Sequence, residues 1–162
     1  MLDQVLADFR RICESAGGKI SPSSEWICSL GERLSLDAVK RISRLMEKNK
    51  EIIGYGPMVF SFPDGDLMYL KNPLGIYEVE IRERFDVPED LASSIDGRLP
   101  PGCFLSSEGF MRARLSCYLW IGKRGFEKKA EELFRRYEAA RKLVKEMSGN
   151  YIRVSRRVFV QE

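Results

Sequence analysis

The sequence contains no histidine. Histidine is the side chain that most often acts as a general base near neutral pH, and it is the commonest ligand of transition metals. Its absence excludes histidine-based catalytic triads and most zinc or copper sites. An enzyme built on this chain would depend on carboxylates, lysines or tyrosines. We therefore expect no catalytic residues and no bound metal ion.

Cysteine is scarce and widely spaced, with four residues at Cys13, Cys28, Cys103 and Cys117. None forms the close C-x-x-C pair from which zinc sites usually draw their ligands. The sequence favours four buried, reduced thiols that pack as small apolar residues. The alternative is that the fold gathers the four cysteines as ligands of a metal ion or cluster.

Long apolar runs are also missing, since none approaches the ~20 residues that a transmembrane helix needs. The N-terminus, Met1-Leu2-Asp3, lacks the basic region and apolar stretch of a signal peptide. A length of 162 residues with 44% apolar and 31% charged residues is typical of one globular domain. We expect a single domain over residues 1–162, located in the cytoplasm and without membrane contact.

Charge is unevenly distributed along the chain. Residues 98–162 carry 15 Lys and Arg against 7 Asp and Glu, whereas residues 1–97 carry 12 against 17. A basic half favours a polyanionic partner, and the acidic half would face protein partners. The alternative is that the basic residues are the solvated surface of helices.

Hydrophobic periodicity predicts both helices and strands. The expected helices cover residues 2–16, a short segment from Pro22 to Gly31, a segment after the N-cap Ser35, a short segment from Pro88, and residues 126–147. The expected strands form a hairpin over residues 58–70, a half-exposed strand over 76–85 and a final strand over 151–160. Residues 107–121 fit a strand and a helix equally well.

Arginine dominates the basic set of the C-terminal half. Guanidinium groups match phosphate oxygens in a bidentate way, and aromatic side chains stack on bases. We expect nucleic acid or nucleotide to bind at residues of this set, together with one tyrosine among them: Arg112, Arg114, Tyr118, Lys123, Arg124, Arg153 and Arg157.

Two other functions are open. Two helices followed by a hairpin over residues 22–71 resemble a winged helix, which would read duplex DNA through Lys40, Arg41 and Arg44. An acidic set faintly resembles the PD-(D/E)xK nuclease pattern and would hold a divalent metal ion. It consists of Asp64, Glu78 and Glu80, with Arg82 where that family has lysine.

A longer pattern runs from Leu99-Pro100-Pro101 through Met111-Arg112-Ala113-Arg114-Leu115 to Gly125 and Glu131-Glu132-Leu133-Phe134. It resembles the C-terminal domain of the primase large subunit over about a third of the chain. No cysteine follows Cys117, and Cys103 is displaced by one residue from the first ligand position of that family's iron–sulfur cluster. Met111 also replaces a histidine of the family. The chain thus looks most like the cluster-free, non-catalytic third subunit of some archaeal primases.

The resemblance implies a helical conformation for residues 107–121. The expected fold is therefore helix-rich α+β, a helical bundle with a β-hairpin and short strands. It also implies that the chain binds single-stranded template and the initiating nucleoside triphosphate, beside the catalytic and large subunits of a primase. Arg112 and Arg114 would hold phosphate, and no cofactor is expected.

Overall fold

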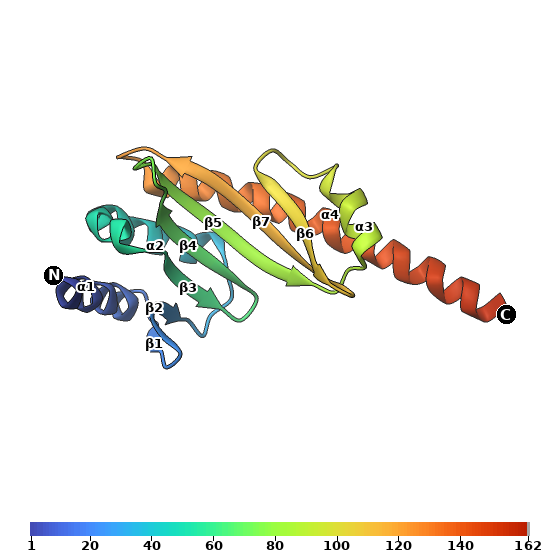
Figure 1. The fold of residues 1–162 in the computed structure, drawn as a ribbon, viewed down its shortest axis with the longest axis horizontal. Helices are drawn as coiled ribbons and strands as arrows, with labels where there is room; N and C mark the ends of the chain where they lie inside the picture. The colour runs from blue at the N-terminus through green and yellow to red at the C-terminus, as the bar shows by residue number, and fades with distance from the viewer. Residues whose placement is uncertain (162) are drawn as a thin grey trace.

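The computed structural model describes the backbone of residues 1–161 and the side chains of residues 1–149. Its helices are α1 (Leu2–Ser15), α2 (Leu36–Lys48), the 3-10 helix η1 (Lys50–Tyr55), α3 (Glu89–Asp96) and α4 (Phe126–Gln161). Its strands are β1 (Lys19–Ser21), β2 (Ser24–Ser29), β3 (Met58–Phe62), β4 (Gly65–Lys71), β5 (Tyr77–Phe85), β6 (Cys103–Gly109) and β7 (Arg112–Ile121). Figure 1 shows these strands side by side, with α4 running along the sheet.

The strands form one seven-stranded sheet in the order β1-β2-β3-β4-β5-β7-β6. Neighbouring strands are antiparallel except β2 and β3, which pair in parallel across the connection that contains α2. The expected α+β class is confirmed. The expected helical bundle is wrong, because the sheet is the element on which the helices pack.

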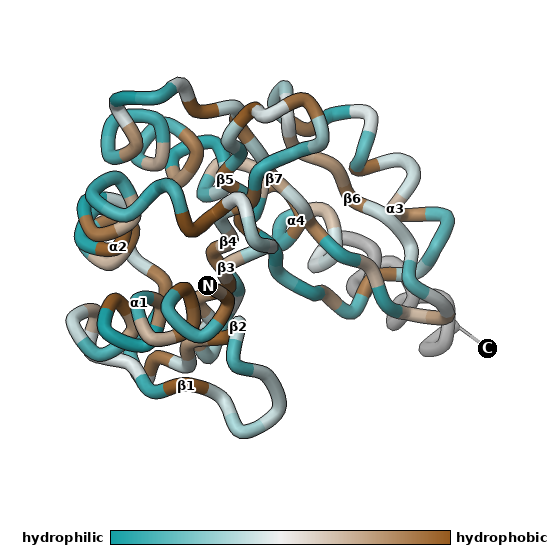
Figure 2. The backbone as a smooth tube through the Cα atoms, turned by 60° about the vertical axis from the view of Figure 1, so that its left-hand side comes forward, coloured by the Kyte–Doolittle hydropathy of each residue, from teal (hydrophilic) through white to brown (hydrophobic). Residues whose placement is uncertain are grey.

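The helices lie on one face of the sheet. A chain of aromatic contacts joins α1 to β3 through Phe9 and Phe60, β3 to β4 through Tyr69, and β4 to α4 through Phe126. The hydroxyl of Ser43 on α2 lies 2.5 Å from that of Tyr69, which is fully buried. Each turn of α1 and α2 carries hydrophobic residues on one side and hydrophilic residues on the other (Figure 2), as expected for amphipathic helices.

The opposite face of the sheet carries no helix among residues 1–161, and we call it the open face. Side chains alternate between the two faces of a strand. Val79 and Ile81 are buried under the helices, so their neighbours on β5 point to the open face, and the same holds for alternate residues of β7. In its central part the open face consists of Glu78, Glu80, Arg82, Arg84, Arg112, Arg114, Ser116, Tyr118 and Trp120.

Several local predictions are confirmed. The Ser35 hydroxyl accepts a hydrogen bond from the amide of Ala38 and caps α2, as its position in the sequence predicts. The hairpin forms from β3 and β4, the half-exposed strand is β5, and a short helix follows Pro88.

Three segments differ from the predictions. The helix expected from Pro22 is wrong, because Pro22 and Ser23 turn the chain between β1 and β2. The helix implied for residues 107–121 is wrong, because these residues belong to β6, its turn and β7. The strand expected over 151–160 is wrong, because α4 continues to Gln161. A glycine inside a helix costs only about 1 kcal/mol, so Gly149 does not end it.

The cysteines are buried as predicted, but they are not reduced. Cys13 on α1 forms a disulfide with Cys28 on β2, and Cys103 on β6 forms one with Cys117 on β7. Cys103 and Cys117 are directly opposed in the strand register, which brings residues distant in sequence within bonding reach. Sequence spacing alone cannot reveal such a pairing.

In the part of the chain that the structure describes, no helix has the length and apolar character needed to cross a membrane.

Candidate functional site

Strand β7 brings together three of the seven predicted binding residues. Arg112, Arg114 and Tyr118 occupy alternate positions of this strand and therefore share the open face. Trp120 follows at the next position of the same row and is 59% exposed. We call Arg112, Arg114, Ser116, Tyr118 and Trp120 the β7 row. It carries arginine at one end and aromatic rings at the other.

An aromatic platform adjoins this row. The ring of Phe104 on β6 stacks on that of Tyr118, with centroids 5.7 Å apart and planes inclined by 16°. Phe104 is 45% exposed. Flat, accessible rings held on a rigid sheet offer stacking surfaces for planar ligands such as nucleobases.

The arginines of the open face differ in how far neighbouring acids neutralise them. Arg82 pairs with Glu80 at 2.5 Å, whereas Glu108 lies 3.2 Å from Nε of Arg84 and 3.9 Å from Nη1 of Arg114. Arg112 is exposed and takes part in no ion pair among the described side chains. The buried Nε of Arg114 has no hydrogen-bond acceptor among the described residues, so it leaves a donor for a ligand oxygen.

A cavity of about 440 Å³ lies at the start of β4, beside the second half of β5. It is lined by the turn Pro63–Asp66 and by Arg82, Glu83, Arg84 and Arg114. Glu83 points to the helix side, where it accepts hydrogen bonds from the Tyr137 hydroxyl and, at 2.9 Å, from Nε of Arg141. Burial and the neighbouring Glu83 raise the pKa of Tyr137, so it stays protonated and donates.

The remaining predicted site residues lie elsewhere. Lys123 and Arg124 are exposed in the turn between β7 and α4, beyond the aromatic end of the β7 row. The side chains of Arg153 and Arg157 lie outside the described residues. Sequence reasoning did not assign Phe104, Arg82 or Arg84 to this site. Arg82 and Arg84 lie in the strand that the sequence predicts over 76–85, but only the pairing of that strand with β7 places them in this site. The helical interpretation of residues 107–121 excluded that pairing, and with it the pairing of Phe104 on β6.

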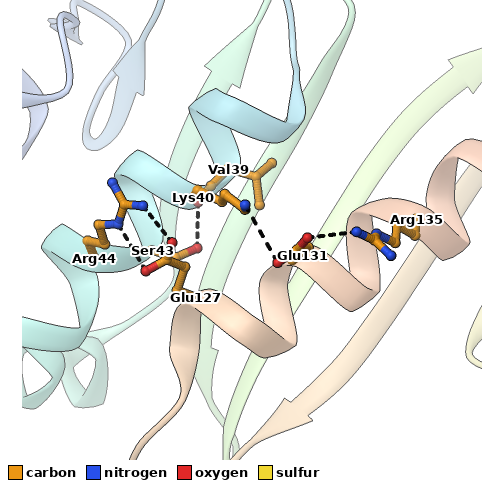
Figure 3. A network of polar contacts seen from close by, with 7 residues as sticks. All are labelled: Val39, Lys40, Ser43, Arg44, Glu127, Glu131 and Arg135. Atoms are coloured by element: carbon orange, nitrogen blue, oxygen red, sulfur yellow. Dashed lines mark hydrogen bonds and ion pairs between the residues drawn. The ribbon is translucent and has the colours of Figure 1, made fainter.

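The basic face of α2 is not available in the way a winged helix requires. Arg44 donates two hydrogen bonds, of 2.9 and 2.7 Å, to Glu127 on α4, and Lys40 lies 3.7 Å from Glu131, which also pairs with Arg135 (Figure 3). Arg41 pairs with Glu32 at 2.7 Å. These cations fasten α2 to its surroundings, and the hairpin β3–β4 lies inside the sheet rather than beside it as a wing.

The acidic set also has structural roles. Asp64 accepts a hydrogen bond of 2.9 Å from the amide of Leu34, and Glu80 is paired with Arg82. Among the described residues, no group of three or more His, Cys, Asp and Glu side chains is placed to hold a metal ion. The geometry gives no support to the nuclease alternative.

The fold and this face define an α+β protein with helices on one side of a mixed sheet and an aromatic, arginine-bearing surface on the other. Comparison with protein-family models, with curated proteins and with solved structures found no match.

Proposed function

We propose that the open face binds single-stranded nucleic acid, with bases stacked on Phe104, Tyr118 and Trp120 and phosphates held by Arg112 and Arg114. The observation that carries the proposal is the β7 row, in which alternate residues place arginines and aromatic rings on one uncovered face. Sheets that display aromatic rings in this way stack two or three unpaired bases, which a duplex keeps hidden.

The dimensions suit a short stretch of single strand. Strand residues rise by about 3.3 Å each, so Arg112 and Trp120 are about 26 Å apart along β7. Lys123 and Arg124 extend the cationic groups past Trp120. A strand lying along β7 would thus meet cations at both ends and rings between them.

The distribution of ion pairs sets the expected salt dependence. Acids accompany Arg82, Arg84 and Arg114. Three cations of the surface take part in no ion pair among the described side chains: Arg112, Lys123 and Arg124. Three phosphate contacts give a slope of about −2 for log K against log salt with a single strand. Stacking should therefore supply most of the affinity.

The finer form of the proposal is the primase setting that the resemblance implies. A subunit without catalytic residues would hold the template strand and the initiating nucleoside triphosphate for the catalytic and large subunits. Holding two reactants in one geometry raises their effective concentration, which is the limiting difficulty of joining two free nucleotides. A cytoplasmic protein with disulfides fits this setting, because intracellular proteins of hyperthermophilic archaea retain them.

The test is fluorescence anisotropy with labelled single-stranded DNA and RNA across a salt series. Trp120→Ala should weaken binding about 5- to 150-fold, the loss expected for one stacked base. Arg112→Ala should weaken it less and reduce the salt slope by about one. Lys145→Ala is the matched control, since Lys145 is an exposed cation on α4, on the helix side.

Unchanged affinity in Trp120→Ala, or equal effects of Arg112→Ala and Lys145→Ala, would contradict the proposed surface. A primer-synthesis assay with primase catalytic and large subunits tests the finer form separately. Single-strand binding without any stimulation of primer synthesis would retain the surface and reject the primase role.

A further inference from the structure

The turn between β6 and β7 is the most exposed apolar feature of the described chain. Gly109 and Arg112 are the last opposed pair of the hairpin, and Phe110 and Met111 join them. Phe110 is 96% exposed and Met111 is 37% exposed. Two-residue hairpin turns usually contain Asn, Asp or Gly, so a Phe-Met turn is unusual on local grounds.

Met111 also has a backbone conformation that its side chain disfavours. Its φ is 58°, in the left-handed region, and no other non-glycine residue of the described chain has a positive φ. Glycine or asparagine would occupy this position at lower conformational free energy. A strained turn that exposes a phenyl ring is the kind of local departure found at binding sites.

The base of this turn is held firmly. Glu108 bridges Arg84 on β5 and Arg114 on β7, at 3.2 and 3.9 Å. The Ser107 hydroxyl also donates to the carbonyl of Gly109. The two apolar side chains therefore project from a fixed support.

The turn continues directly into the arginine end of the β7 row, because Arg112 follows Met111 in the chain. Figure 1 shows the β6–β7 turn at the end of β5, whereas the β4–β5 turn lies at the opposite end of that strand. A nucleic acid strand that follows the β7 row past Arg114 and Arg112 would reach Phe110 next. We expect the part of the nucleic acid that reaches Phe110 to be the junction at which the single strand becomes a duplex.

We propose that Phe110 and Met111 form an apolar wedge that packs against the terminal base pair of a single-strand–duplex junction, while the β7 row holds the single-stranded arm. This inference rests on the proposed function. Apolar side chains flanked by basic residues contact bases in this way when proteins enter or unstack a duplex. Arg112 joins the turn to the β7 row and would hold the phosphate at which the single strand meets the duplex.

A membrane is the less favoured partner of this turn. One exposed Phe and one half-exposed Met bury little apolar area in a lipid surface, and stable membrane attachment needs more than a single weak anchor. The turn continues into the aromatic and arginine residues of β7. A nucleic acid strand would use both the turn and this row, whereas a lipid surface would not require the row.

The experiment compares two labelled probes: a single strand, and a stem-loop duplex that carries the same strand as a tail. The wild type should prefer the junction probe by about tenfold or more, the gain expected from burying a phenyl ring. Phe110→Ser should bring the two dissociation constants to within about twofold of each other, with single-strand affinity unchanged. Leu74→Ser is the matched control, since Leu74 is 83% exposed in the β4–β5 turn.

The outcomes separate this inference from the proposed function. Wild type that binds single strand but binds both probes equally would overturn the wedge and leave the open-face proposal intact. Wild type that binds neither probe would overturn both. Loss of preference in Leu74→Ser as well as in Phe110→Ser would show a general apolar effect and overturn the wedge.

Two further results complete the test. Trp120→Ala should weaken binding of both probes by a similar factor and preserve the preference, which supports separate roles for the row and the wedge. Binding to phosphatidylserine-containing vesicles that disappears in Phe110→Ser, with no junction preference in the wild type, would overturn the wedge in favour of membrane contact.

Discussion

Chemical reduction of the two disulfides should lower the free energy of unfolding by a predictable amount. The bridge Cys13–Cys28 closes a chain segment with a sequence separation of 15, and Cys103–Cys117 closes one of 14. Constraining the unfolded chain over a loop of about 15 residues contributes about 3 kcal/mol at 25 °C. Because the bridges lie at different ends of the sheet, their contributions should be nearly additive.

In a chain of this length, 1 kcal/mol changes the melting temperature by about 2–4 °C. Each bridge should therefore contribute about 6–12 °C. The measurement is circular dichroism of thermal unfolding with and without a phosphine reductant, beside a thiol titration in denaturant. The double variants Cys13→Ala/Cys28→Ala and Cys103→Ala/Cys117→Ala measure how much each bridge contributes to the melting temperature.

The thiol titration should detect no free thiol before reduction and four afterwards. Four thiols before reduction, in protein purified without reductant, would refute the pairing. A melting temperature that reduction leaves unchanged would refute the loop-closure argument.

Three further predictions concern stability. Hydrogen bonds from Arg44 lower the pKa of Glu127, so the stabilisation that Glu127 gives is present above the ordinary carboxyl pKa and is lost as pH falls through the lowered value. The melting-temperature difference between wild type and Glu127→Gln should therefore shrink to nothing on acidification. A difference that stays constant with pH would contradict the ion pair. Met111→Gly should raise the free energy of unfolding by up to ~1 kcal/mol in urea denaturation, since it relieves the left-handed backbone, whereas a loss of stability would refute the strain. Gly18→Ala should lower the free energy of unfolding by about 1–3 kcal/mol, because the added methyl group would lie 2.5 Å from Sγ of Cys28. An unchanged free energy of unfolding would show that the structure relaxes freely around this methyl group.

Elements with a strong local signal could be predicted from the sequence. Helix α1 and the first part of α4 have long apolar stripes, and β5 alternates between buried Val79 and Ile81 and polar neighbours. The hairpin β3–β4 followed from the turn residues between two apolar runs. In each case the residues that decide the conformation are close together in the chain.

Elements that depend on distant partners could not be predicted. The parallel pairing of β2 with β3 joins segments separated by a whole helix. Strand β7 pairs with the distant β5, and β6 pairs with β7. On a helix, Arg114 and Tyr118 would share one face as an i,i+4 pair, and Arg112 would point away from them. They share one surface because the segment is a strand, an arrangement that was not predicted from the sequence. Their role in binding stays a prediction.

The position of α4 in the chain has a consequence for synthesis. This helix follows all seven strands and covers β5 and β7, whose buried residues include Ile81, Leu115 and Cys117. At a synthesis rate of about 5–20 residues per second, its 36 residues take about 2–7 s to emerge after the last strand. During that interval the nascent sheet has one apolar face without its main helix, which makes this the stage at which a ribosome-associated chaperone would be needed most.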